Sequence, residues 1–201
     1  MENSIIVESA DKVSANTESV LNQSPAKYTP AHVANYILKT FFKENIEITP
    51  IKLQKLLYIS YGWNLAFSNK KLFDEPIQAW KWGPVVPSIY YYYRKMKDIP
   101  NNYYVGVFDE EKFDYSSLEM VPIIPEEDEE ITDVLKLVLA NYKHKSAFDL
   151  VSLTHEKESP WDKVYNKDNI PESGKNLPLN DSDIKNRSMK RILDLYPIAQ
   201  Q

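Results

Sequence analysis

One segment of this chain, TPIKLQKLLYISYGWNLAFSN at residues 49–69, has no polar face along most of its length. Thr49 and Pro50 mark a helix start, because threonine is a good N-cap and proline fits the first helical position. Beyond Lys55 the apolar residues point in every direction: Leu56, Leu57, Tyr58, Ile59, Tyr61, Trp63, Leu65 and Phe67. A helix of this kind lies in the middle of a domain. We therefore predict a mainly α fold, a compact helical domain around one buried central helix.

Further helices are expected around the central one. A second Thr-Pro pair opens TPAHVANYILKTFFKE at residues 29–44. Acidic residues open PEEDEEITDVLKLVLANYKHKS, where they complement the helix dipole. Ser146 with Asp149 resembles a capping box that starts SAFDLVSLTHEKE, and Asn180 or Asp181 caps the last helix, DSDIKNRSMKRILDLY.

The segment KKLFDEPIQAWKWGPVVPS interrupts this helical pattern. Its proline resists helix and the residues after it alternate in character. We predict a small extended or hairpin element near residues 72–82, folded around the acidic residues and ending at Gly83-Pro84. A helix is then expected from about Val85 to Lys97.

That helix contains four consecutive tyrosines, and a helical wheel separates them. The following residues fall within about 120° and form a core stripe: Val85, Val86, Ile89, Tyr92, Tyr93 and Met96. Tyr90 lies on the edge of the stripe, and Tyr91 points nearly the opposite way. An exposed tyrosine is a good interface anchor, although single exposed aromatics are also common without any function. We predict a partner-binding surface made of Tyr91, Tyr90, Lys81 and Arg94.

The two tryptophans before the tyrosines are expected to be core residues. Trp80 and Trp82 share one side if the segment is extended, because strand side chains alternate. Gly83 lets the chain turn before Pro84 without a side-chain clash. We predict the following structural core: Leu56, Leu57, Trp63, Trp80, Trp82, Gly83, Pro84 and Trp161.

Composition limits the function classes. The 201 residues include no cysteine, which excludes disulfides, thiolate metal sites and cysteine nucleophiles and favours a cytoplasmic location. No apolar run approaches the roughly 20 residues of a membrane span, and the N-terminus does not read as a signal peptide. Residues 1–27 are polar and are expected to be a flexible extension, while residues 28–201 form a single domain.

Several motifs together resemble a known family. They are LQKLLYISYGW (residues 53–63), Leu72-Phe73, AWKWGPVVPSIY (residues 79–90) and LTHEKESPW (residues 153–161). Their order and spacing resemble the Panacea domain, the antitoxin domain of the SocA type that also occurs in phage-associated proteins. The resemblance extends over about residues 29–195.

The resemblance implies a mostly helical, non-catalytic protein that needs no cofactor. Panacea proteins neutralise a toxin encoded beside them, usually by binding it, and SocA-like members can also hand the toxin to a processive protease. The toxins of the family are diverse, so the domain does not identify the toxin. The expected partners are therefore a cognate protein toxin and, for the adaptor mode, a protease.

The residues themselves offer little for catalysis or metal binding. None of the histidines lies in a zinc motif, and the four glycines form no phosphate-binding loop. His155 with Glu156 and Glu158 is the one acid-base candidate. The competing interpretation, which we favour, is that His155 ends a helix, where it can bond a terminal carbonyl.

Nucleic-acid binding is the alternative function. The link KHKS between two expected helices resembles a helix-turn-helix, but the second helix offers Asp149 and apolar groups where base-reading residues are needed. The last helix carries four cations that can contact phosphates or face water: Lys185, Arg187, Lys190 and Arg191. The net charge of −5 argues against nucleic acid as the main partner. We therefore predict a toxin-binding antitoxin, with a nucleic-acid-binding phage or regulatory protein as the alternative.

Overall fold

A computed structural model describes residues 25–108, 118–166 and 176–197. Residues 1–24, most of the expected N-terminal extension, lie outside the described residues. The helices are α2 (Pro30–Lys43), α3 (Pro50–Ser68), α4 (Pro87–Tyr93), α5 (Glu129–Tyr142), α6 (Ala147–Thr154), α7 (Pro160–Tyr165) and α8 (Asp181–Leu195). Short strands pair as two antiparallel hairpins, β1 (Gln78–Trp80) with β2 (Gly83–Val85), and β3 (Gly106–Phe108) with β4 (Leu118–Met120). The fold is mainly α, as predicted.

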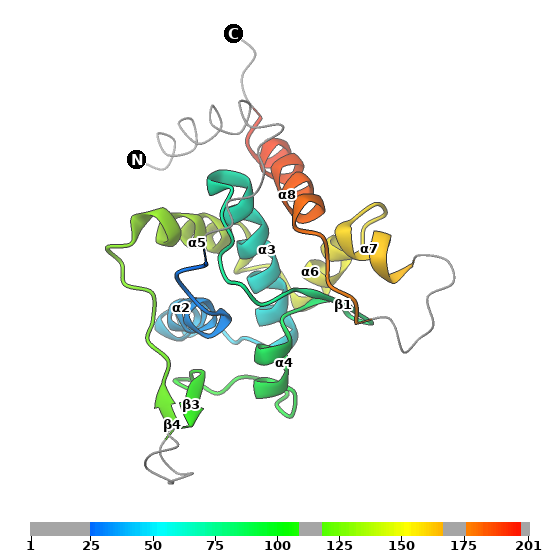
Figure 1. Cartoon of the computed structure of the whole chain (residues 1–201). Helices are drawn as coiled ribbons and strands as arrows, with labels where there is room; N and C mark the ends of the chain where they lie inside the picture. The colour runs from blue at the N-terminus through cyan, green and yellow to red at the C-terminus, as the bar shows by residue number, and fades with distance from the viewer. Residues whose placement is uncertain (1–24, 109–117, 167–175, 198–201) are drawn as a thin grey trace.

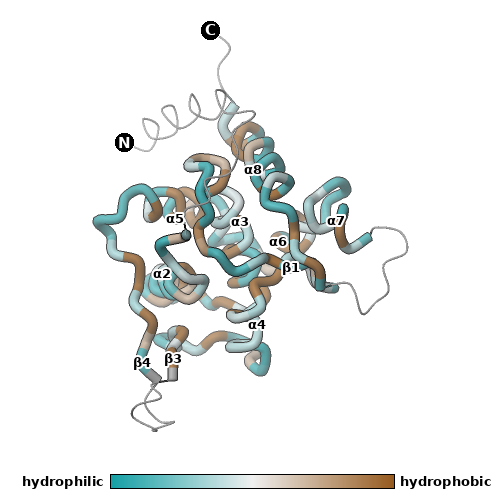
Figure 2. The backbone as a smooth tube through the Cα atoms, viewed as in Figure 1, coloured by the Kyte–Doolittle hydropathy of each residue, from teal (hydrophilic) through white to brown (hydrophobic). Residues whose placement is uncertain are grey.

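Helix α3 is the centre of the molecule. Every residue from Lys52 to Ala66 is buried, including the polar ones. Helices α2, α4, α5, α6 and α8 and strand β2 all pack on it, and Figure 1 shows them arranged around it. Figure 2 shows hydrophobic positions recurring along these surrounding elements. The prediction of one buried central helix is confirmed.

The local start signals work as the sequence predicts. The Thr49 side chain accepts a hydrogen bond from the Lys52 amide at the start of α3. At α6 the Asp149 amide donates to Ser146 Oγ, and the Ser146 amide donates to the Asp149 carboxylate. Of the two candidate caps of α8, Asn180 is the one that accepts from a helical amide.

The hairpin lies later in the chain than predicted. Its strands are Gln78–Trp80 and Gly83–Val85, and Lys81 and Trp82 alone form the turn between them. The acidic residues near 74 precede the hairpin and are not its turn. Gly83-Pro84 does not end the extended piece but opens the second strand, because a two-residue connection is enough to reverse an antiparallel pair.

Helix α4 is shorter than the predicted Val85–Lys97. Val85 belongs to β2, and the helix begins at Pro87 after Val86 as N-cap and ends at Tyr93. The predicted stripe is nevertheless largely internal, with Val86, Ile89 and Tyr93 buried. Tyr91, which the wheel places on the opposite side, is 58% exposed.

The β3–β4 hairpin is tied to α2 through one buried side chain. The Asn35 amide group donates to the carbonyls of Val105 and Val121, and its oxygen accepts from the Val105 amide. A buried side-chain amide satisfied in this way fixes the position of the backbone it bonds. None of the described helices combines the length and the apolarity needed to cross a membrane.

Candidate binding groove

The β1–β2 hairpin is held from behind by three side chains from two helices that are distant in sequence. From α3, the Gln54 side chain bonds both the amide and the carbonyl of Val86, just after β2. The Lys55 ammonium, also from α3, donates to the Pro84 carbonyl at 3.0 Å. From α7, Trp161 Nε1 donates to the Trp80 carbonyl at 2.7 Å. These bonds fix the hairpin against the domain and leave its turn facing outward.

Gly83 is required where the hairpin meets the core. Its φ of 97° lies in the region that side chains avoid. A Cβ at this position would come within 2.5 Å of Lys55 Nζ and 2.9 Å of His155 Cε1. The glycine therefore lets the strand lie directly on these two side chains, which come from α3 and from the end of α6.

Lys55 is an unusual residue for the inside of a domain. It is 1% exposed, and no ion pair with a carboxylate is found for it among the described residues. Burial lowers the pKa of the Lys55 ammonium to about 7. An unpaired buried cation is costly to the fold, so its position beneath the hairpin calls for an explanation.

A groove of about 630 Å³ opens on the outer side of this arrangement. It is lined by residues between Thr49 and Lys55, between Trp80 and Val85 and between Tyr90 and Lys97, and by Ala147. In Figure 1 these positions correspond to the start of α3, the hairpin, α4 with the segment after it, and the start of α6. The volume lies within the range of ligand and side-chain pockets in proteins.

The groove combines apolar walls with positive charge. Its basic residues are Lys55, Lys81, Arg94 and Lys97, and no Asp or Glu occurs among the described residues that line it. Two of these cations lie over exposed aromatic rings, Lys81 over Trp82 at 5.5 Å and Arg94 over Tyr91 at 5.3 Å. The first turn of α3 adds the positive end of a helix dipole.

Three of the predicted partner-binding residues, Tyr90, Lys81 and Arg94, line the groove. Tyr91 lies beside it rather than in its lining, with its ring 6.1 Å from that of Trp80. The structure therefore brings the four residues to one region of the surface.

The expected core residues separate into two groups. Leu56, Leu57, Trp63, Gly83, Pro84 and Trp161 are buried. Trp80 is half-buried, and Trp82 is 64% exposed, so its assignment to the core is wrong. The alternation argument assumed one continuous strand, whereas Trp82 lies in the turn, where its side chain points away from the domain.

Sequence reasoning missed several residues of the groove. The sequence pattern marks Lys55 only as the residue after which the helix is apolar on all sides. Ile51, which is 47% exposed at the start of α3, lines the groove, and the exposed Phe148 directly follows Ala147 of its lining. The sequence signal that could have identified Lys55 is a charged residue directly before the part of the helix that is apolar on all sides.

Comparisons with known proteins identify the family. The family described as antitoxin SocA-like, Panacea domain, matches residues 53–162. Antitoxin SocA of Caulobacter vibrioides (strain NA1000 / CB15N) is 30% identical over 146 residues, which cover 73% of this chain and 75% of the relative. The chain belongs to the SocA-like Panacea family. No solved structure matches it.

The part of the chain that matches the Panacea family begins in α3 and ends in α7. It therefore contains the segments that hold the hairpin, with Gln54 and Lys55 near its start and Trp161 near its end. The hairpin and α4 lie between them. Most of the groove is thus built from the region that the chain shares with its family, and the first turn of α3, from Thr49 to Ile51, lies just outside that region.

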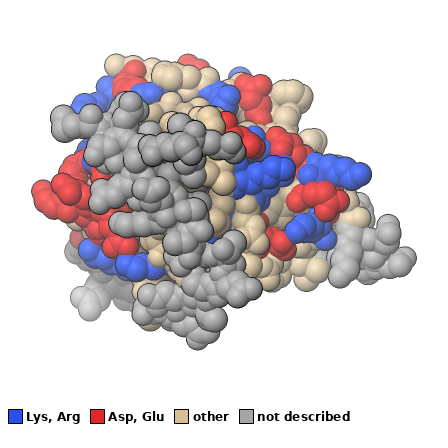
Figure 3. Space-filling view, turned by 90° about the horizontal axis from the view of Figure 1, so that it is seen from above, with Lys and Arg blue, Asp and Glu red and all other residues tan. Residues whose placement is uncertain are grey.

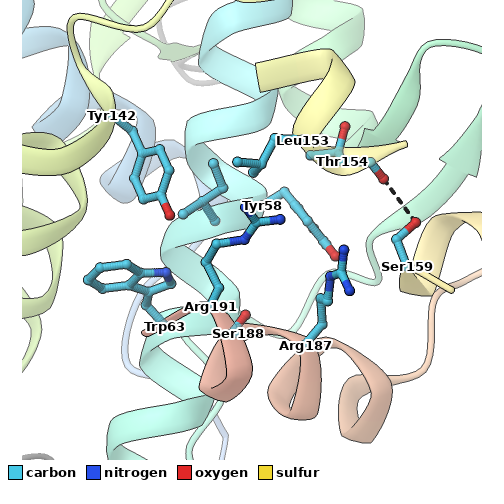
Figure 4. A pocket seen from close by; sticks show the side chains of 10 residues that line it. Tyr58, Trp63, Tyr142, Leu153, Thr154, Ser159, Arg187, Ser188 and Arg191 are labelled. Carbon is cyan, nitrogen blue, oxygen red and sulfur yellow. Dashed lines mark hydrogen bonds between the residues drawn. The ribbon is translucent and has the colours of Figure 1, made fainter. Parts of the chain in front are cut away.

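A second cavity is too small to be a ligand site. Its volume is about 30 Å³, and it lies between α3, α5, α6 and α8. Figure 4 shows Arg187 and Arg191 extending from α8 toward α3, where Tyr58 lies. A space of this size holds about one water molecule.

The acid-base candidate of the sequence makes contacts that stabilise the fold. His155 is the C-cap of α6, and its Nδ1 donates to the Val151 carbonyl at 2.7 Å. The Glu156 carboxylate pairs with both Arg187 and Arg191. Among the described residues no cluster of His, Asp or Glu could hold a metal ion.

The basic residues of α8 do not form a row of outward cations. Lys185 is buried and bonds Asn69, while Arg187 and Arg191 pair with Glu156, which leaves the exposed Lys190. On the face seen from above in Figure 3, basic and acidic side chains are interspersed. In the possible helix-turn-helix, Asp149 is committed to its capping box. These contacts favour neither form of nucleic-acid binding.

Proposed function

We propose that this chain is the antitoxin of a toxin–antitoxin system and neutralises a protein toxin by binding it directly through the groove. Membership of the SocA-like family supports the antitoxin role. The observation that carries the binding proposal is the groove itself, an apolar and positively charged surface built from the family region and bordered by exposed aromatic residues. Interfaces favour aromatic and arginine anchors of this kind.

The proposed contacts are Tyr91, Tyr90, Lys81 and Arg94, joined by Trp82. Tyr91 and Trp82 are exposed, and the ring of each is covered on one side by a neighbouring cation. A partner that covers these side chains removes aromatic area from water without first displacing packed residues. The surface is therefore ready to bind without rearrangement of the core.

The test is neutralisation in a living cell. The protein encoded beside this chain is expressed from an inducible promoter, alone and together with the chain, and growth is followed. We expect growth arrest that the chain relieves, and a nuclease-resistant complex in a tagged pull-down. Arrest that continues in the presence of the folded chain, or a complex that disappears on nuclease treatment, contradicts the proposal.

The same experiment separates two modes of neutralisation. If the chain also acts as an adaptor that delivers the toxin to a processive protease, the toxin half-life shortens when the chain is present. If the chain only covers the toxin, the toxin accumulates in an inactive complex. Immunoblots of the toxin after translation is stopped distinguish the two results.

A further inference from the structure

We propose that the groove takes an acidic segment of its protein partner, one in which an aliphatic or aromatic side chain is flanked by carboxylates. The apolar side chain packs against Trp82 and Ile51, and the carboxylates meet the cations of the groove, with Lys55 at its floor. This inference rests on the proposed function, because it names the chemistry of the segment that the same surface would bind.

The charge of the groove is complementary to an acidic partner. The whole chain has 29 acidic and 24 basic residues, so an average surface region carries a small excess of acid. The groove departs from this average, because its described lining contains four basic residues and no acidic one. Such local concentration of one sign attracts and orients a partner of the opposite sign.

Within the part of the chain that the structure describes, Lys55 lacks a counter-ion at the floor of the groove. An ammonium group can donate three hydrogen bonds, and the bond to the Pro84 carbonyl is the one found for it among the described residues. It is buried without a counter-ion, although it belongs to the lining of the groove. A carboxylate held in the groove lies close to this uncompensated charge, in a region shielded from water where electrostatic attraction is strong.

Apolar surface surrounds this charge. Trp82 and Ile51 are among the most exposed large hydrophobic side chains of the described residues, and both belong to the groove. Met96 and Val85 continue the apolar lining. A purely polar anion would leave this area uncovered, so a peptide segment with its own apolar side chain fits better than a small anion.

Panning of a random peptide library tests the inference without knowledge of the toxin. A displayed library of twelve-residue peptides is selected on the immobilised full-length chain, and the selected peptides are synthesised for affinity measurements. We expect enrichment of Asp and Glu next to Trp, Phe, Leu or Ile. Selected peptides without acidic enrichment overturn the inference.

Lys55→Met is the decisive variant, with Lys190→Gln as its control. Methionine is unbranched and only one atom shorter than lysine, and it removes the buried charge, a replacement that tends to be neutral or stabilising for a fold. We expect an unchanged or higher melting temperature and at least about tenfold weaker peptide binding, whereas Lys190→Gln on α8 leaves both unchanged. Equal affinity for Lys55→Met overturns the inference.

A rim variant keeps the test valid if Lys55→Met does not fold. Lys81 and Arg94 are both exposed, so the double variant Lys81→Gln/Arg94→Gln preserves the core. It must weaken the binding of the acidic peptides, whereas Lys190→Gln must leave that binding unchanged. Two other occupants are also distinguishable. Displacement of the peptides by a synthetic copy of residues 1–24, or dimerisation of the chain through the groove, assigns the groove to this chain itself and contradicts the inference.

Competition with the toxin separates this inference from the proposed function. Peptides that bind through Lys55 but do not displace the toxin support the acidic-segment chemistry and refute toxin binding at the groove. Neutralisation of the toxin by a chain that selects no acidic peptide supports the antitoxin role and refutes the acidic-segment chemistry.

Discussion

Trp82→Ala should mainly weaken binding and Trp63→Ala should mainly destabilise the fold, because Trp82 lies in the turn of the hairpin and Trp63 lies in the core. Trp63 is 1% exposed, and Trp82 is 64% exposed. An aromatic side chain has roughly 150–250 Å² of surface, so about 80 Å² of Trp82 is covered. At about 25 cal/mol per Å², Trp82→Ala costs at most about 2 kcal/mol of folding free energy, an upper bound because the extended chain is the reference. Trp63→Ala should cost about 3–5 kcal/mol.

The same exposed area sets the expected effect on binding. If a partner covers the remaining surface of Trp82, roughly 150 Å², the same coefficient gives an upper bound of about 4 kcal/mol of binding free energy. The truncation should cost at least the roughly 2 kcal/mol of a binding hot spot, about 30-fold in affinity. Urea unfolding measures the first quantity, and titration calorimetry with the purified toxin measures the second. Leu193→Ala on α8 is the control, since Leu193 is also an exposed apolar residue but lies outside the groove. A loss of about 3 kcal/mol or more in the unfolding of Trp82→Ala, or toxin affinity equal to that of the wild type, refutes the reasoning.

Two further predictions concern stability. Because burial lowers the pKa of Lys55 to about 7, the unfolded chain binds a proton there that the native chain lacks between pH 7 and the ordinary lysine value. The free energy of unfolding of the wild type, relative to that of Lys55→Met, should therefore rise with pH by up to about 1.4 kcal/mol per unit from pH 7 to 8.5. A difference that does not change with pH contradicts an unpaired buried ammonium. A Cβ on Gly62 would come within 2.2 Å of Ser188 Oγ, where α3 meets α8, so Gly62→Ala should cost about 1–3 kcal/mol. The double variant Gly62→Ala/Ser188→Ala lacks this hydroxyl group and should regain much of the lost stability in a thermal melt. If it does not, the loss of stability has another cause.

The features that local sequence determines were predictable. Helix starts at Thr49 and Ser146 depend on hydrogen bonds between residues three apart, and the wheel correctly placed Tyr91 away from the core. The apolar character of α3 on all sides was enough to identify the centre of the fold.

The hairpin was misplaced for a physical reason. Two short strands joined by Lys81 and Trp82 have no Asn-Gly or Asp-Gly signal, and their position is set by bonds from Gln54, Lys55 and Trp161, which are distant in sequence. A periodicity argument sees none of these bonds. It therefore extended the strand through the turn and assigned Trp82 to the core.

The groove could not be derived for the same reason. It exists only where the start of α3, the hairpin, the segment after α4 and the start of α6 meet. Sequence reasoning selected Lys81 from the hairpin, Tyr90 from α4 and Arg94 directly after it. It had no basis for adding Ile51 or Lys55 from the start of α3.

The central claim is that a toxin binds the groove, and hydrogen–deuterium exchange of the chain with and without its toxin measures this directly. The account predicts slower exchange in the complex at the Lys81–Trp82 turn, in α4 and at the start of α3. Protection confined to α8 or to the β3–β4 hairpin, with unchanged exchange around the groove, would show that the toxin binds elsewhere and would contradict the account.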